Sequence, residues 1–395
     1  MTNEKHTSYT LKNYAALYKN ELLNEVLPFW ENHSLDQEFG GYFTCLTPKG
    51  EVYDTDKFIW LQARQVWMFS TLYQLVGKKQ NWKDIAKLGA NFLEKYGRDA
   101  HGDWYFSLNQ KGQPLVQPYN IFSDCFAAMA FGKLYEIDPQ GNYAEIAKTT
   151  FEHIIKRQHN PKGKYDKSYP GTRAMQNFAL PMILCNLSLE LEPLLGSEKV
   201  SEVTDSVIDL VMNTFYDQTS GLVLENVSDT GEFVDSFEGR LLNPGHAIEA
   251  MWFIMNLGIR KNDKALIEKA EKIMFQQLEH GWDSEYGGIL YFMDCKGHPP
   301  QQLEHDQKLW WVHLETLVAL AKTFAYNQNP KAAEWFKKVH DYTWTHFRDT
   351  ENSGEWFGYL NRQGKVSLNL KGGKWKGCFH VPRALLEVWK TLEKI

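Results

Sequence analysis

Apolar residues recur along most of the chain at the three- and four-residue spacing of amphipathic α-helices. After Asp56, for example, Ile59, Val66, Phe69 and Leu72 are separated by polar positions in this way. The pattern predicts about two helices in each repeat described below, or roughly twelve in all. The predicted helices span residues 10–32, 56–76, 82–96, 121–137, 143–158, 174–191, 200–215, 244–259, 264–279, 307–325, 330–347 and 382–393.

A short turn rich in Asp and Gly recurs between these helices, about every 60 residues. Each turn leads into a short aromatic hairpin and then into helical sequence. The sixfold period predicts an all-α fold, an (α/α)6 barrel with the hairpin turns at one end, formed by residues 1–395 as a single domain. An open solenoid is the alternative, but it would need polar capping repeats. The turns begin at residues 36, 99, 160, 217, 283 and 349.

Composition restricts the partners. The 395 residues are 43% hydrophobic and 14% aromatic, with a formal net charge of −6, which argues against nucleic acid or an anionic membrane as the main partner. The aromatic surplus suits either a large core or a cleft for rings. No apolar run approaches the roughly 20 residues of a membrane span, and the polar N-terminus lacks a signal-peptide core. We therefore expect a cytoplasmic protein.

Candidate binding groups follow the first and third turns. In FIWLQARQVWMF, Arg64 is flanked at i−4 by Trp60 and at i+3 by Trp67. An arginine on such a stripe is either a member of a buried ion pair or a fork for ligand oxygens. After the third turn, Arg173, Gln176 and Asn177 precede an apolar helix. We expect them to reach the same cavity.

The fourth turn is followed by RLLNPGHAIEAMWF. Asn243 and Pro244 suit the N-cap and N1 positions, so His246 falls in the first turn with Glu249 at i+3 on the same face. A helix N-terminus should hold His246 neutral, while Glu249 can orient the ring or stabilise its cation. A capped structural His–Glu pair is the alternative. HxxE without another nearby ligand predicts no metal site.

The last two turns supply three more candidates. Trp311 and Glu315 share a helix face, and Glu315 lies among apolar residues where a carboxylate needs a partner. The glycine-broken stretch from Leu370 to Arg383 brings His380 to the start of the final helix. A satisfied loop histidine is the alternative for His380.

In a closed barrel these helix starts would meet at one rim. Two neutral histidines on opposite walls, His246 and His380, would suit removal of a proton from one face of a carbon alpha to a carbonyl and its return to the other. Carbon 2 of an open-chain aldose is such a carbon. Arg64 is then the donor for the enolate-like oxygen.

The chain resembles the N-acylglucosamine 2-epimerase family, which includes the renin-binding proteins. The similar stretches are FIWLQARQVWMF, LENVS, LLNPGHAIEAMWF, GWDSEYGGILYF, KLWWVHLE and GEWFGYLNRQGKVSLNLKGGKWKGCFHVPR. The resemblance implies an (α/α)6 barrel and interconversion of N-acetylglucosamine and N-acetylmannosamine at carbon 2. His246 and His380 match the acid/base pair. Glu249 and Glu315 match the supporting carboxylates, and Arg64, Trp311, Trp375 and Asn177 match substrate contacts.

The resemblance also implies that no cofactor is consumed, that ATP is a candidate allosteric activator, and that the protein is a homodimer. KGGKWKG is not a P-loop, because GxxxxGK[ST] is absent, and we expect it to shape the pocket. An epimerase or isomerase of an unmodified sugar such as cellobiose or mannose is the nearest alternative. A glycoside hydrolase using Glu249 and Glu315 and a non-catalytic binding protein are more distant ones.

Overall fold

The computed structural model describes residues 2–169 and 171–395, with side chains from residue 11 onward. The helices are α1 (Thr2–Glu21), η1 (Leu22–Val26, π-helical), α2 (Leu27–His33), α3 (Ile59–Leu75), α4 (Gln80–Tyr96), α5 (Ile121–Ile137), α6 (Tyr143–Arg157), η2 (Gly163–Tyr165, 3-10), α7 (Ala179–Glu190), α8 (Glu192–Leu195), α9 (Ser197–Asp209), η3 (Leu210–Thr214, π-helical), α10 (Pro244–Lys261), α11 (Lys264–Gly281), α12 (Trp310–Asn327), α13 (Pro330–His346) and α14 (His380–Leu392). The strands are β1 (Cys45–Leu46), β2 (Val52–Asp54), β3 (Lys57–Phe58), β4 (Ser107–Leu108), β5 (Pro114–Val116), β6 (Met175–Asn177), β7 (Tyr216–Asp217), β8 (Leu222–Val223), β9 (Asn226–Ser228), β10 (Leu241–Leu242), β11 (Met293–Asp294), β12 (Lys308–Leu309) and β13 (Tyr359–Leu360).

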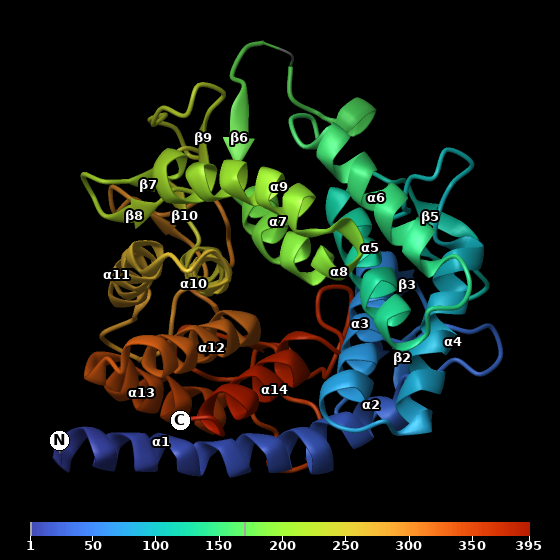
Figure 1. Cartoon of the computed structure of the whole chain (residues 1–395), viewed down its shortest axis with the longest axis horizontal. Helices are drawn as coiled ribbons and strands as arrows, with labels where there is room; N and C mark the ends of the chain where they lie inside the picture. The colour runs from blue at the N-terminus through green and yellow to red at the C-terminus, as the bar shows by residue number, and fades with distance from the viewer. Residues whose placement is uncertain (1, 170) are drawn as a thin grey trace.

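The helices form an α/α barrel. Helices α3, α5, α7, α10, α12 and α14 make the inner ring, and α4, α6, α9, α11, α13 and α1 pack on its outside. In Figure 1 the colour passes once around this ring from blue through green and yellow to red. The N-terminal helix α1 lies along α13 and α14, so the two ends of the chain close the barrel together. This confirms the barrel predicted from the sixfold repeat.

Burial separates the two rings. Every residue of α12 from Trp310 to Phe324 is buried, because inner helices are covered on both sides. The outer helix α4 buries one stripe that includes Trp82, Ile85 and Phe92, and its other face is exposed. Most buried apolar side chains belong to one continuous core cluster. Among the described helices, none has the length and apolar character that a membrane span requires.

The recurring turns explain the repeat. In five of the turns an aspartate at the equivalent position accepts hydrogen bonds from two backbone N–H groups, two to four residues further along the chain, and these bonds fix the turn. In three turns a buried lysine completes the site: the Nζ–Oδ2 distances are 2.7 Å for Lys57, 3.1 Å for Lys308 and 2.9 Å for Lys371. The aspartates are Asp36, Asp99, Asp217, Asp283 and Asp349.

Short antiparallel strand pairs lie where inner helices begin. Strands β3 and β12 lead directly into α3 and α12, and β10 precedes α10 by one residue. Three predicted helices were wrong at their starts: those expected from residues 56, 174 and 307 begin only after the short strands β3, β6 and β12. The largest difference is at Met175–Asn177, which forms β6, paired with β9. The Asn177 side chain accepts a hydrogen bond from the Ala179 N–H, which favours beginning the helix only there.

Candidate active site

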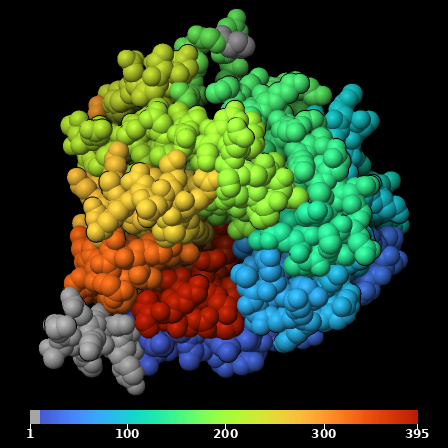
Figure 2. All heavy atoms as spheres, in the orientation of Figure 1, coloured from blue at the N-terminus to red at the C-terminus, as the bar shows by residue number. Residues whose placement is uncertain are grey.

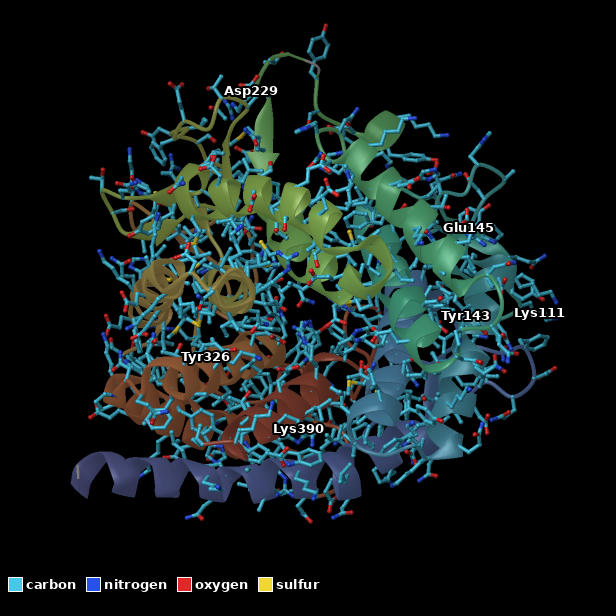
Figure 3. All side chains as sticks on the ribbon, viewed as in Figure 1. Lys111, Tyr143, Glu145, Asp229, Tyr326 and Lys390 are labelled. Carbon is cyan, nitrogen blue, oxygen red and sulfur yellow. The ribbon has the colours of Figure 1, made fainter. Side chains whose placement is uncertain are left out.

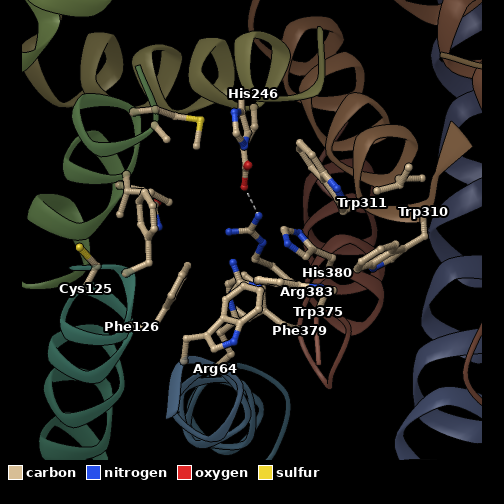
Figure 4. A pocket seen from close by; sticks show the side chains of 18 of the residues that line it. Arg64, Cys125, Phe126, His246, Trp310, Trp311, Trp375, Phe379, His380 and Arg383 are labelled. Carbon is tan, nitrogen blue, oxygen red and sulfur yellow. Dashed lines mark hydrogen bonds and ion pairs between the residues drawn. The ribbon is translucent and has the colours of Figure 1, made fainter. Parts of the chain in front are cut away.

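A cavity of about 620 Å³ lies at the N-terminal ends of the inner helices. Figure 4 shows side chains from several of these helices converging on it, with His246, Arg64 and His380 approaching from different directions. The wall from α5 and α7 is mainly apolar, whereas α10 and α14 bring charged groups. Its polar or charged lining residues include Arg64, Asn120, Asn186, His246, Glu249, Tyr291, Glu304, Gln307, Tyr359, His380 and Arg383.

His246 lies in the first turn of α10, as predicted. Asn243 caps the helix by accepting the His246 N–H at 3.1 Å, and Pro244 occupies N1. The ring Nδ1, however, lies 3.0 Å from Oε1 of Glu225, a residue between β8 and β9. The prediction that Glu249 orients this ring was therefore wrong. With Nδ1 held by Glu225, Nε2 is left for the cavity.

The charge state expected for His246 also needs correction. Burial lowers the pKa of His246, but the charges of Glu225 and Glu249 outweigh burial, so its pKa lies above the ordinary value. From sequence, the position at a helix N-terminus predicted a neutral ring. The contact with Glu225 was not visible there, because Glu225 is 21 residues away along the chain. His246 is thus the ring in this cavity that holds a proton more readily.

His380 is the first residue of α14 and meets a different carboxylate. Its Nδ1 lies 2.7 Å from Oε1 of Glu315 on α12. The other Glu315 oxygen accepts the Trp252 indole N–H at 3.2 Å. Burial and the charges of Arg64 and Arg383 hold the pKa of His380 well below its ordinary value. Nε2 of this ring, too, is left for the cavity.

Arg383 binds the two carboxylates that sequence analysis singled out. Its Nη2 lies 2.6 Å from Oε1 of Glu315 and also forms a short ion pair with Glu249. Burial alone would lower the pKa of Arg383, but the two carboxylates raise it. Glu249, Glu315 and His380 are close enough together to hold a metal ion. Arg383 already supplies a positive charge to both carboxylates. That no metal binds here remains a prediction.

Arg64 is a buried cation without an anion of its own. Its guanidinium carbon lies 3.9 Å from the Phe126 ring centre and 4.4 Å from that of Trp60. Among the described residues no carboxylate forms an ion pair with it, and Nε has no hydrogen-bond partner. Burial and then Arg383 lower the pKa of Arg64 to about 9, so it remains charged at neutral pH. Of the two roles weighed from sequence, a fork for ligand oxygens fits this geometry.

Aromatic rings connect these groups. The Trp311 ring centre lies 5.2 Å from His246 and 5.9 Å from His380, so one indole contacts both imidazoles. The two histidines come from α10 and α14, which flank α12, rather than from opposite walls as expected. Trp375 lines the cavity and packs against Trp60 with 5.7 Å between ring centres.

The three polar residues expected from the third repeat do not line the cavity. The Asn177 side chain is exposed, and its NH₂ donates to the Glu225 carbonyl at 3.2 Å and to Oδ1 of Asn226 at 2.9 Å. Gln176 donates to the carbonyl of Asp229, and Arg173 pairs with Glu238. These contacts stabilise the pairing of β6 with β9 and the loop beside it, and not the cavity. Asn186, two turns further along α7, lines the cavity instead.

Two of the three lysines of KGGKWKG, Lys371 and Lys376, are committed to structure, whereas Lys374 is exposed. Lys371 binds Asp349, and Lys376 Nζ lies 2.8 Å from Oε1 of Glu355. Both lysine side chains are at most 1% exposed, so they cannot also bind phosphates. Tyr53 donates to the Gly372 carbonyl at 3.0 Å. These contacts hold the loop that carries Trp375 into the cavity.

A family model for N-acylglucosamine 2-epimerase (GlcNAc 2-epimerase) matches residues 41–384. The chain belongs to the N-acylglucosamine 2-epimerase family. It is 40% identical to the N-acylglucosamine 2-epimerase of Rattus norvegicus, covering 92% of this chain and 88% of that protein. Identity to the Homo sapiens enzyme is also 40%, over 92% and 86%. The structure of cellobiose 2-epimerase from Bacillus thermoamylovorans superimposes with a TM-score of 0.83 at 22% identity, covering 97% of this chain and all of that one.

The sequence analysis missed two charged residues of the site, Glu225 and Arg383. Glu225 lies between two strands, far in sequence from His246. Arg383 follows His380 by one helical turn, and that i+3 spacing was the available signal. Glu225 is the carboxylate partner of His246, and Arg383 is the cation that pairs with Glu249 and Glu315.

Proposed function

We propose that this protein is an isomerase that interconverts N-acetylglucosamine and N-acetylmannosamine by proton transfer at carbon 2 of the open-chain sugar. The observation that carries the proposal is the matched pair of histidines. Each has Nδ1 held by its own carboxylate and Nε2 free in one cavity, and their pKa values are shifted in opposite directions. Such a divergence assigns acid and base roles. The 40% identity to named N-acylglucosamine 2-epimerases supports the substrate.

In one direction neutral His380 accepts the proton from carbon 2 at Nε2. The electrons of the broken C–H bond form a C1–C2 double bond, and the aldehyde oxygen becomes an enolate oxygen. Arg64, which forms no ion pair with any carboxylate that the structure describes, stabilises that oxygen. Protonated His246 then delivers its Nε2 proton to the other face of carbon 2, and the C1–O double bond re-forms. The reverse reaction begins with the proton on His380.

Glu225 and Glu315 act as the supporting carboxylates in this scheme. Each holds its histidine in the Nδ1–H tautomer and stabilises the imidazolium when that ring is charged. Glu249 acts less directly, through Arg383 and through its charge on His246. Trp311 and Trp375 would pack against the carbon skeleton of the sugar. Asn177 is omitted, because its side chain is used in the hairpin.

An epimerase of an unmodified sugar is a second candidate, favoured by the likeness in fold to cellobiose 2-epimerase. A glycoside hydrolase is not supported, since one of its two carboxyls must arrive protonated as the general acid. Here Arg383 forms ion pairs with both Glu249 and Glu315, and Glu315 also contacts His380, so neither carboxyl is free to protonate a glycosidic oxygen. A purely binding role would leave the paired histidines unexplained.

Family membership supports further proposals: a single catalytic domain, a homodimer in the cytoplasm, no consumed cofactor, and ATP as an allosteric effector rather than a reactant. Two of the three lysines of KGGKWKG, Lys371 and Lys376, are buried in ion pairs, and only Lys374 of this stretch is exposed, which favours a site for such an effector elsewhere. Activity with ATP and with a non-hydrolysable analogue would test this. Equal activation by both would support an effector role.

The test of the main proposal is proton NMR of N-acetylglucosamine in heavy water with the purified protein. We expect N-acetylmannosamine to appear with deuterium at carbon 2. His246→Asn and His380→Asn should each abolish epimerisation, while His280→Asn, on the exposed face of α11, should not change it. Exchange on cellobiose or mannose alone would make the second candidate correct. Undiminished epimerisation in either active-site variant would refute the two-histidine mechanism.

A further inference from the structure

The first and last parts of the chain meet around the final helix. Figure 2 shows α14 in red beside the blue N-terminal segments, and α1 packs along it. At the cavity end of the barrel, the loop of residues 370–379 leads into α14 and carries Trp375. The N–H groups of Lys371 and Gly372 in this loop donate to the Leu46 carbonyl of β1, at 3.0 and 3.3 Å. The first repeat therefore holds a loop of the last repeat.

Tyr53 lies in β2 and contacts the same loop. Its hydroxyl donates to the Gly372 carbonyl at 3.0 Å, although 46% of the residue is exposed. A Cβ placed on Gly373 would lie 2.8 Å from the Tyr53 hydroxyl oxygen, and apart from its chain neighbours no other described atom comes within 4 Å of it. Glycine at position 373 therefore leaves the space that the hydroxyl occupies.

Trp375 needs this loop to fix its position. Its ring lies 5.7 Å from the Trp60 ring and 6.0 Å from the Phe106 ring, measured between ring centres, yet 49% of the residue is exposed. A side chain that is half in water keeps much of its freedom unless the backbone that carries it is held. His380 differs, because it is buried and its Nδ1 is bound by Glu315. A shift of the loop should therefore move the indole more than the imidazole.

We propose that Tyr53 is a positioning residue for Trp375: its hydrogen bond to the Gly372 carbonyl holds the loop so that the indole faces the substrate. The inference rests on the proposed function, in which Trp375 packs against the sugar. Tyr53 does not itself line the cavity, so it acts through the loop. Because His380 is fixed separately, the hydrogen bond from Tyr53 affects substrate binding and not proton transfer.

The test measures KM and kcat for N-acetylglucosamine in two variants that break the same contact. Tyr53→Phe removes the hydroxyl and should raise KM about fivefold, with kcat within about twofold, because one hydrogen bond that supports binding is lost. Gly373→Ala should give the same result, because its new methyl group displaces the Tyr53 hydroxyl. The double variant should be no worse than either single variant, since both act on one contact.

Two further variants show whether the effect passes through the indole. In the Trp375→Ala background, Tyr53→Phe should change KM less than about twofold, because the ring that it positions is gone. Tyr326→Phe is the matched control. The Tyr326 hydroxyl donates to Asn256 at 3.1 Å near the far end of α12, where Figure 3 labels the residue. This variant should leave both KM and kcat unchanged.

An unchanged KM in Tyr53→Phe would overturn the proposal while leaving the epimerase function intact. A rise in KM that persists in the Trp375→Ala background would also overturn it, because Tyr53 would then act on another part of the site. So would a loss confined to kcat. If the unmodified enzyme does not turn over N-acetylglucosamine, the proposed function is wrong and the role of Tyr53 is wrong with it.

Discussion

Replacing Glu225 by Gln tests the link between electrostatics and proton transfer most directly. The carboxylate lies 3.0 Å from Nδ1 of His246 and favours the imidazolium. Two unit charges about 4 Å apart contribute about 4 kcal/mol at an effective dielectric constant of about 20. Gln keeps a hydrogen bond and nearby groups relax, so we expect about half of this, ~2 kcal/mol. Because one pKa unit is about 1.4 kcal/mol, the pKa of His246 should fall by about 1.5 units.

The pH dependence of activity shows in which direction the pKa of His246 moves. His380, with its lowered pKa, becomes inactive as a base only when the pH falls through that low value. His246, with its raised pKa, stops being an acid only when the pH rises through that high value. Activity should therefore be high between the two pKa values. In Glu225→Gln the basic limb should move to lower pH, and the acidic limb should stay.

The assay is deuterium incorporation at carbon 2, followed by NMR from pH 5 to 10 in both reaction directions. Because the equilibrium constant between two neutral sugars does not depend on pH, the shift must be the same in both directions. Glu232→Gln is the matched control: it removes an exposed carboxylate from the same segment. A basic limb that stays in place in Glu225→Gln, with activity retained, would refute the assigned role of Glu225.

Three further perturbations have distinct expected results. Arg64→Lys should lower kcat/KM about 100-fold or more, since a point charge replaces a fork held between rings; a loss below about threefold would contradict its role at the oxyanion. Asn177→Ala should leave kcat/KM within twofold, and a tenfold rise in KM would return this residue to the substrate site. Lys376→Met should lower the free energy of unfolding by about 3–5 kcal/mol in urea denaturation, because Glu355 would be left buried and unpaired; an unchanged midpoint would contradict this.

Much of the fold could be predicted from sequence because its signals are local. Helical periodicity placed α5 at its observed bounds, and the N-cap at Asn243 placed His246 in the first turn of α10. The failure at Met175–Asn177 has a physical cause: three residues carry too little periodicity to distinguish a strand from the start of a helix. Its partner, β9, lies about 50 residues away along the chain, and pairing over that distance leaves no local pattern.

Most residues of the candidate site could be predicted from sequence, but which side chains pair with one another could not. His246, His380, Arg64 and Glu315 all line or support one cavity, as expected from equivalent positions in the repeat. Which carboxylate meets which imidazole depends on the crossing of separate helices and loops. LENVS was recognised as part of the family resemblance, yet nothing in its spacing indicated that its glutamate would reach His246.

The charges around the cavity argue that the two histidines share one proton. Among the buried groups, Arg64 and Arg383 provide two positive charges, and Glu225, Glu249 and Glu315 provide three negative ones, whereas Glu304 at the cavity is exposed to solvent. One imidazolium balances them, whereas none or two would leave a net charge in a buried site, which is costly. In the proposed reaction one ring gains a proton as the other loses one, so the total charge is the same before and after turnover. A carboxylate at each Nδ1 then serves whichever ring is charged, which is what a reversible epimerisation requires.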